Sequence, residues 1–437
     1  MKKLINYAYK FRIYPTKEQE KTFFQDFGNA RFVYNEILKQ YQKDQLENKT
    51  SWNFYGYNKL LPSLKQQYPF LKISNSQILA QEIRHLDTAF KNYFAHRTEA
   101  PVLKRRKDDK GIAIPQKFKI KGNLLFIPKL KTPIKIKLHR EIIGKIKNIV
   151  ITKTAANNFF VCVAVEKEIE TLKKVNKLVG IDVGLKTFAV IATTSLKAAK
   201  TKALSELSFV YSKLENPKYL LKAEKHLKRL QKALSKKQHK RSEKDVTKAS
   251  KNYIKACKKL AGPHGQVAAQ RKDFLQKATS NLIHENQVLG LEDLNIAGMK
   301  KNHHLAKAIS DVGWGYFKTF LKYKASWYGR RIVEADRFFA SSKTCSTPNC
   351  TYVKKDLKLS DRFWTCPICG HLHDRDENGA TEVAYITIAA VTTVPPERGE
   401  RGRTSAKTPV ESKTAAFVLE KEQGQVLTTK QEAARPS

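Results

Sequence analysis

Three acidic residues lie where one element of the chain gives way to the next. Asp182 ends the apolar run VGID, Glu292 ends the apolar run VLGLE, and Asp376 comes just before a helical segment. An unpaired carboxylate is costly to bury. A core hydrogen bond explains a single acid of this kind, and a solvated acidic loop explains the D-x-D of Asp374 and Asp376. Three acids that met at one edge of a sheet would repel one another unless divalent cations neutralised them.

Such a carboxylate cluster has a specific chemistry. A site made only of oxygen ligands suits Mg²⁺ or Mn²⁺. Two such ions about 4 Å apart would activate a water molecule and stabilise the leaving oxygen during phosphodiester cleavage. The positions of the acids alone leave both the structural and the catalytic interpretation open.

Four of the six cysteines form a second candidate metal site. Cys345 and Cys350 are spaced C-x4-C, and Cys366 and Cys369 are spaced C-x2-C, with fifteen residues between the pairs. Both spacings can wrap one tetrahedral ion, and four thiolates complete its coordination, which indicates structural Zn²⁺. His371 and His373 are therefore not needed as ligands.

The elements that must position these groups form an α/β pattern. The segment 177–194 predicts two buried strands joined by a tight turn, and 287–294 and 330–339 predict further strands. Helical periodicity predicts helices over 266–284 and 317–329. The acids would then lie at strand ends and at a strand–helix junction.

The first part of the chain predicts a different module. Residues 7–16 alternate as a half-exposed strand, and Thr16 with Gln19 is a capping-box pattern that opens a helix. The face of this helix carries Phe23, Phe27, Ala30 and Tyr34. Helical sequence continues to about Arg97, and strands follow from Gly122. After about Val391 the chain is aperiodic and rich in Pro, Gly, Ser and Thr, which predicts a disordered tail.

The charge balance indicates the partner. The 437 residues contain 83 Lys and Arg against 40 Asp and Glu, a net charge of +43. Nucleic acid is the usual neutralising polyanion for such a surface. An anionic membrane is the rival, but no apolar run of about 20 residues could span a bilayer. The N-terminus also lacks the apolar region of a signal peptide. We therefore expect a soluble, cytoplasmic protein bound to nucleic acid.

One basic helix is a candidate for phosphate contact. Leu220, Ala223, Leu227, Leu230 and Leu234 recur at steps of three and four, which is a heptad-like seam. Four basic residues fall mainly off this seam and could face phosphates, although a solvated helix surface explains them equally well: Lys225, Lys228, Arg229 and Lys232.

A set of ordered motifs over most of residues 1–390 resembles the TnpB family of transposon-encoded, RNA-guided endonucleases, which are related to type V CRISPR effectors. The motifs are YKFRIYPTKEQ, ENPKYLLKAEKHLKRLQKALS, GIDVGLKTFAVI, the segment from LGLEDL to SWYG, DRFFASSKTC, the cysteine pairs and HDRDENGA. The sequence departs from the family in its C-x4-C pair, where C-x2-C is usual, and in the irregular segment 193–209.

The resemblance implies a fold and a site. It implies an RNase H-like RuvC nuclease domain at 176–340 and 372–392 with a zinc ribbon inserted at 341–371. It also implies a β-barrel WED-like module at 1–13 and 101–175, a helical REC-like module at 14–100 and a tail at 393–437. The family's three catalytic, metal-binding acids fall on Asp182, Glu292 and Asp376. Asp374 and Asp293 are left as neighbours of the ligands or solvated groups.

The resemblance also implies the partners and the reaction. The protein would bind a guide RNA made from its transposon end and cleave target double-stranded DNA beside a short motif, with Mg²⁺ or Mn²⁺ as the only catalytic cofactor. A catalytically dead relative that represses DNA is the main alternative, but such proteins lose one or more acids. A plain zinc-ribbon RNA-binding protein does not explain three acids at strand ends, and no Tyr/His strand-transfer motif supports transposition chemistry.

Overall fold

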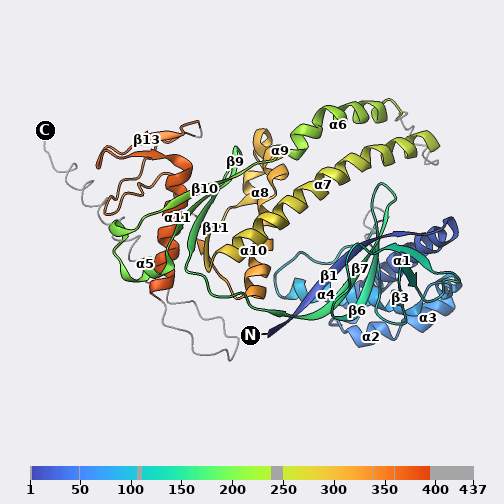
Figure 1. Ribbon diagram of the computed structural model, residues 1–437. Helices are drawn as coiled ribbons and strands as arrows, with labels where there is room; N and C mark the ends of the chain where they lie inside the picture. Colours follow the sequence, from blue (N-terminus) through green and yellow to red (C-terminus); the bar gives the residue numbers. More distant parts are fainter. Residues whose placement is uncertain are drawn as a thin grey trace. The chain divides into compact units, whose positions relative to one another are not determined.

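The computed structural model of the protein describes residues 2–48, 50–105, 111–237, 250–337, 339–358 and 360–393. The chain folds into two compact units (Figure 1). The N-terminal unit contains Lys2–Ile169 and Leu230–Gly262, and the C-terminal unit contains Glu170–Arg229 and the chain from Pro263 onward. No helix in the described ranges is both long enough and apolar enough to cross a membrane. The predicted tail lies outside the described residues, apart from residue 393.

The N-terminal unit contains a seven-stranded sheet in the order β2-β6-β7-β1-β5-β4-β3. The strands alternate buried and exposed residues, as their sequences predict. Their bounds are β1 (Lys2–Tyr14), β2 (Gly111–Ile114), β3 (Lys119–Lys121), β4 (Leu124–Phe126), β5 (Ile134–Lys137), β6 (Lys145–Lys153) and β7 (Phe159–Glu170).

Helices complete this unit with a core of their own. The predicted capping box forms, since the Thr16 amide donates to Gln19 Oε1 at 2.9 Å and the Gln19 amide donates to Thr16 Oγ1 at 3.3 Å. The predicted apolar face of the helix that follows is buried. The helices are α1 (Lys17–Asn48), α2 (Phe54–Asn58), α3 (Leu61–Gln67), the 3₁₀ helix η1 (Pro69–Lys72) and α4 (Ser76–Phe94).

The C-terminal unit contains a five-stranded mixed sheet in the order β10-β9-β8-β11-β12. The strands β8, β9 and β10 are antiparallel neighbours, whereas β8, β11 and β12 run parallel. The sequence did not predict β10, because its residues are mostly exposed and show no apolar alternation. The bounds are β8 (Leu178–Val183), β9 (Thr187–Thr194), β10 (Val210–Glu215), β11 (Val288–Glu292) and β12 (Arg331–Ala335).

Within the described residues, eight helical segments accompany this sheet, and parts of α6 and α7 belong to Leu230–Gly262 of the other unit. The predicted helix at 266–284 is part of α7, which begins earlier and contains Pro263. The segments are α5 (Leu196–Thr201), the 3₁₀ helix η3 (Leu204–Glu206), α6 (Tyr219–Ser235), α7 (Lys251–Glu285), α8 (Ile296–Met299), α9 (His303–Val312), α10 (Trp314–Tyr328) and α11 (Arg375–Thr392).

The two faces of the sheet are covered by different helices, and the alternation of side chains along β8 and β11 decides which residue meets which helix. Val179, Ile181, Leu289 and Leu291 pack with side chains of α7, α9 and α10. The alternate positions on the opposite face meet α11, which packs against β8, β9 and β11 (Figure 1).

Two glycines let α11 lie directly on the sheet. Gly180 of β8 and Gly290 of β11 are register partners. A Cβ on Gly180 would overlap with the Ala380 carbonyl oxygen and the Ala384 amide nitrogen, and one on Gly290 would overlap with Thr387 Oγ1. Asp182 and Glu292 come two residues after these glycines and therefore face the same helix.

A small two-stranded sheet precedes α11. Its strands β13 (Phe363–Thr365) and β14 (Leu372–Asp374) pair antiparallel. Trp364 is buried beside three of the clustered cysteines. Because β14 ends at Asp374 and α11 begins at Arg375, the ribbon connects to the helix without a linker.

Candidate active site and metal centre

Asp182 is the most buried of the three predicted acids. It lies near the end of β8, on the α11 side, and its side chain is 8% exposed. Burial, followed by the negative charges of Glu292 and Asp376, raises the pKa of Asp182 well above its usual value, while Arg375 acts in the opposite direction. Asp182 and Glu292 lie at the ends of the neighbouring strands β8 and β11, and Asp376 lies in the first turn of α11, which packs against Asp182, so the three residues share one region of the unit.

Glu292 is the last residue of β11, one position beyond Leu291, which pairs with Ile181 of β8. The Ser341 hydroxyl donates a hydrogen bond to Glu292 Oε1. Burial raises the pKa of Glu292, and the Ser341 hydrogen bond acts against that shift. The orientation of this carboxylate therefore depends on the loop that carries Ser341.

Asp376 lies in the first turn of α11, where a carboxylate is favoured by the helix dipole. Arg362 Nη1 lies 3.2 Å from Asp376 Oδ2. One turn into the helix, a Cβ on Gly379 would lie 3.2 Å from Asp182 Cγ. The start of α11 thus lies directly against the Asp182 side chain.

The neighbouring acids Asp374 and Asp293 have definite partners. Asp374 is the N-cap of α11, since its Oδ1 accepts hydrogen bonds from the amides of Asp376 and Glu377 at 2.9 and 3.2 Å. Asp293 forms ion pairs with Lys318 at 2.5 Å and Arg337 at 2.7 Å. Each of these carboxylates already has a structural role, which sets both apart from Asp182 and Glu292.

The carboxylates are close but do not form a closed cage. Among the residues that the structure describes, only the four cysteines bring three or more ligand atoms within 4.8 Å of one another. A cavity of about 450 Å³ opens beside Glu292 and is lined in part by Arg337, Lys343 and Arg375. The acidic residues Glu292, Asp293 and Asp336 line the same cavity, so its lining carries both signs of charge.

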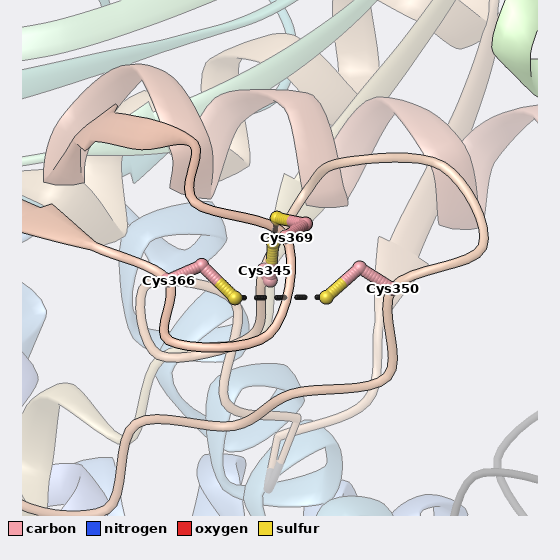
Figure 2. Close-up of side chains that lie close together, drawn as sticks. All are labelled: Cys345, Cys350, Cys366 and Cys369. Atoms are coloured by element: carbon pink, nitrogen blue, oxygen red, sulfur yellow. Dashed lines mark hydrogen bonds between the residues drawn. The ribbon is translucent and has the colours of Figure 1, made fainter.

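The four cysteines converge as their spacing predicts (Figure 2). Cys345 Sγ lies 3.6 Å from Cys369 Sγ, and Cys350 Sγ lies 3.6 Å from Cys366 Sγ. The longer C-x4-C loop turns at Asn349, which has a left-handed φ of 64°. Four sulfur atoms in this arrangement match the donor set of a closed structural Zn²⁺ site.

The cysteine environments differ. Burial raises the pKa of Cys345 and Cys350. Hydrogen bonding with the Thr347 hydroxyl and with the His371 amide lowers the pKa of the exposed Cys369 thiol to about 6. A metal ion would hold all four as thiolates and so remove this difference.

His373, which the sequence analysis set aside as a ligand that is not needed, lies beside this cluster. Its Nε2 lies 3.1 Å from Cys345 Sγ, and its ring lies beside Trp364 with centroids 4.7 Å apart. Burial and the nearby His371 lower the pKa of His373 to about 4, so the ring is neutral at pH 7. The histidine therefore supports a sulfur ligand from outside the four-cysteine set.

The basic helix α6 has the predicted two faces. Leu227 is buried and the other seam residues are half-buried, whereas Lys225, Lys228, Arg229 and Lys232 are exposed. Two of these side chains have partners on the same helix. Lys228 pairs with Glu224 at 2.8 Å, and Arg229 lies 3.1 Å from His226 Nδ1.

Three family descriptions match parts of the chain. Residues 160–303 match the OrfB_IS605 family, described as "Probable transposase". Residues 314–383 match the "Cas12f1-like, TNB domain", and residues 1–49 match a "Helix-turn-helix domain" of the OrfB_IS605 type. In this structure, the described part of 1–49 forms β1 and α1.

Solved structures give only a weak likeness. The Cas12f1–sgRNA–target DNA complex covers 87% of this chain and 99% of its own at 15% identity, with a TM-score of 0.33. CasPhi-2 (Cas12j) bound to crRNA covers 90% and 99% at 8% identity, with a TM-score of 0.41.

Curated relatives are much more similar in sequence. The "Putative RNA-guided DNA endonuclease" of Streptomyces pristinaespiralis is 32% identical over 435 residues, which cover 95% of this chain and 99% of the relative. InsQ of Escherichia coli K12 is 26% identical over 86% of this chain and 91% of the relative. The TnpB-like protein L79 of Acanthamoeba polyphaga mimivirus is 28% identical over 129 residues. On this near full-length similarity, the chain belongs to the TnpB family.

Proposed function

We propose that this protein is an RNA-guided DNA endonuclease of a TnpB-type transposon. Its near full-length relative from Streptomyces pristinaespiralis is named as an RNA-guided DNA endonuclease, which supports this activity. The observation that carries the proposal is geometric: Asp182 and Glu292 follow the paired Gly180 and Gly290 and face α11, whose first turn contains Asp376, although the three acids come from separate segments of the chain. Clustered carboxylates in a basic protein suit a nuclease better than a passive binding surface.

The chemistry follows from these residues. Asp182, Glu292 and Asp376 would hold one or two Mg²⁺ or Mn²⁺ ions, which when bound activate water and stabilise the leaving oxygen of a phosphodiester. Ser341 orients the Glu292 carboxylate. Arg375 and Lys343, in the adjacent cavity, would attract the phosphates of the strand to be cut.

The fold supports an RNase H-like RuvC domain in the C-terminal unit. Its mixed sheet combines an antiparallel arm with a parallel arm and places the first acid on the central strand β8. The zinc ribbon precedes the helix that carries the third acid. The seven-stranded sheet and the helices α1 to α4 would be the WED-like and REC-like modules.

The partners follow from charge and family. A net charge of +43 requires many phosphates to neutralise it. The protein would bind a guide RNA derived from its transposon end, and base pairing of that guide would select the DNA target. The exposed basic face of α6 is the proposed phosphate contact on this helix.

The cysteine cluster would bind Zn²⁺ as a structural ion. Four thiolates leave no open coordination position, so catalysis at this ion is not expected. Elemental analysis of the purified protein tests the assignment. About one zinc per chain is expected, and active protein that contains no zinc would refute it.

The alternative is a guided DNA-binding repressor that does not cut. All three acids are present, and a repressor has no need of a repulsive carboxylate cluster. One experiment tests the part that both proposals share. The protein is expressed from its native locus and purified, and the RNA that copurifies is sequenced. Transposon-end RNA is expected, and random cellular RNA would exclude guided function of either kind.

A further inference from the structure

Asn378 is a buried asparagine whose side chain is fully used. It lies in the first turns of α11 and is 3% exposed. Its Nδ2 donates to the carbonyl oxygens of Ser341 and Thr344 at 3.2 and 2.7 Å, and its Oδ1 accepts from the Ser346 amide at 2.9 Å. One side chain therefore fastens the whole loop 341–346 to the helix.

This loop touches both candidate metal sites. At its start, the Ser341 hydroxyl donates to Glu292 Oε1. Near its end is Cys345, whose amide donates to the Tyr352 carbonyl at 2.9 Å within the ribbon. The position of the loop relative to α11 thus affects the orientation of Glu292 and the start of the cysteine cluster together.

Asn378 also lies close in the helix to the contacts of the two remaining acids, Asp182 and Asp376. Its neighbour Gly379 lies against Asp182, where an added Cβ would be 3.2 Å from Asp182 Cγ. Two residues before it, Asp376 lies in the same helical turn. An asparagine supplies donors and an acceptor at once, which neither aspartate nor leucine can do in this buried position. Unmatched backbone groups in the loop would be costly.

We propose that Asn378 and Ser341 are positioning residues that act in series. Asn378 fixes the position of loop 341–346, and Ser341 in that loop orients the Glu292 carboxylate toward the divalent cation. The inference rests on the proposed nuclease function, because it concerns the same carboxylates. It adds that the ribbon and the carboxylates are linked mechanically through Asn378.

Manganese binding to the full-length protein, measured from the electron paramagnetic resonance of free Mn²⁺, tests the role of Ser341. Ser341→Ala removes one hydrogen bond and no ligand. We expect it to weaken Mn²⁺ binding about 10-fold, as for other groups that orient a ligand. Zinc content should remain that of the wild type. The Mn²⁺ concentration for half-maximal DNA cleavage should rise by the same factor.

The matched control is Asn286→Ala. Asn286 is also a buried asparagine, 4% exposed, and its Nδ2 donates to the Leu282 carbonyl at 3.0 Å. It lies two residues before β11 begins, at the end of the strand away from Glu292. Its loss should lower stability without changing Mn²⁺ affinity, whereas Asn378→Ala should change both.

A double-mutant cycle tests whether the two residues act in series. If they do, the double variant Asn378→Ala/Ser341→Ala should weaken Mn²⁺ binding no more than the single substitution with the larger effect does. If the double variant weakens Mn²⁺ binding by the product of the two single-variant factors, the residues act independently and the proposal is overturned.

Asp182→Ala separates the two levels of proposal. If Asp182→Ala leaves Mn²⁺ binding unchanged, the carboxylate site itself is wrong. If Asp182→Ala abolishes binding while Ser341→Ala and Asn378→Ala bind as the wild type does, only the positioning role is wrong.

Discussion

At the scale of single residues, Asp374 and Asp376 show how two aspartates two positions apart take different roles. Asp374 caps α11 through two amide hydrogen bonds, and Asp376 lies within electrostatic reach of Asp182. The D-x-D pattern alone cannot separate them, since the difference lies in where each side chain points. The family resemblance chose Asp376, and the capping geometry explains why Asp374 is a poor candidate.

Replacing Asp374 tests this separation. Asp374→Ala should lower stability by about 1 kcal/mol through loss of the cap and still leave substantial cutting. Asp374→Asn should restore both stability and activity, because asparagine is an equally good N-cap. Thermal unfolding and cleavage assays measure the two effects. An inactive Asp374→Asn would mean that its charge, and not its cap, is needed.

Asp26 predicts a pH effect in the N-terminal unit. Burial raises its pKa to about 6, against opposing effects of the Ser74 hydrogen bond and Lys129. The folded state then holds this proton more tightly than the unfolded state, so stability falls as pH rises from about 4 to about 6 and stays reduced above that. Asp26→Asn should recover up to about 3 kcal/mol at pH 7.5 and little at pH 4. Urea unfolding with a hydrogen-exchange readout in α1 measures this, and an equal gain at both pH values would contradict it.

Residue roles were predictable from sequence only where the chemistry is local. Asp182, Glu292 and the cysteines stand out because acids after apolar strands and paired cysteines are unusual. Ser341, Asn378 and His373 are ordinary residue types in the sequence. Their roles depend on contacts with Glu292, with loop 341–346 and with Cys345, which only the fold brings together.

At the scale of elements, the contact of α11 with β8 and β11 places the third acid next to the first. The sequence predicted these strands and this helix, but not that paired glycines set their separation. Strand β10 was missed because an exposed edge strand carries little apolar signal. The early start of α7 was missed because Gly262, Pro263 and Gly265 argue against a helix.

Gly180→Ala tests the helix–sheet contact. The new Cβ would overlap with backbone atoms of Ala380 and Ala384, which cannot turn away as a side chain could. The helix must move outward, so stability should fall by about 1–3 kcal/mol, and cutting should be largely lost. Gly265→Ala makes the same chemical change in α7 with nothing within 4 Å. It should retain activity and gain slightly in stability. Loss of cutting in both variants would mean that the effect of Gly180→Ala is not specific to the contact between α11 and the sheet.

At the scale of the whole molecule, the excess of positive charge is the property that composition fixes most firmly. The sequence indicated nucleic acid as the partner, but it could not assign individual contacts, because a solvated lysine and a phosphate-binding lysine look alike. On α6 the basic residues are exposed and the seam is less so, which both interpretations predict. Lys228 is already paired with Glu224 and should contribute least.

Nucleic-acid affinity measured against salt concentration separates these interpretations. Replacing Lys225, Lys228, Arg229 and Lys232 by glutamine should weaken RNA binding. The magnitude of the slope of log affinity against log salt should fall by up to about three, because binding releases fewer counterions when fewer phosphate contacts form. An unchanged slope would mean that this face of α6 is solvated surface and that phosphates bind elsewhere.

The most direct test of the account is cleavage of a guide-matched DNA in Mg²⁺ by the wild type and by Asp182→Ala, Glu292→Ala and Asp376→Ala. Each substitution removes a proposed metal ligand at a site that should contribute little to polyanion affinity. We predict that all three variants bind the guide RNA nearly as tightly as the wild type and fail to cut. Cleavage at the wild-type rate by any one of them would contradict the three-carboxylate site.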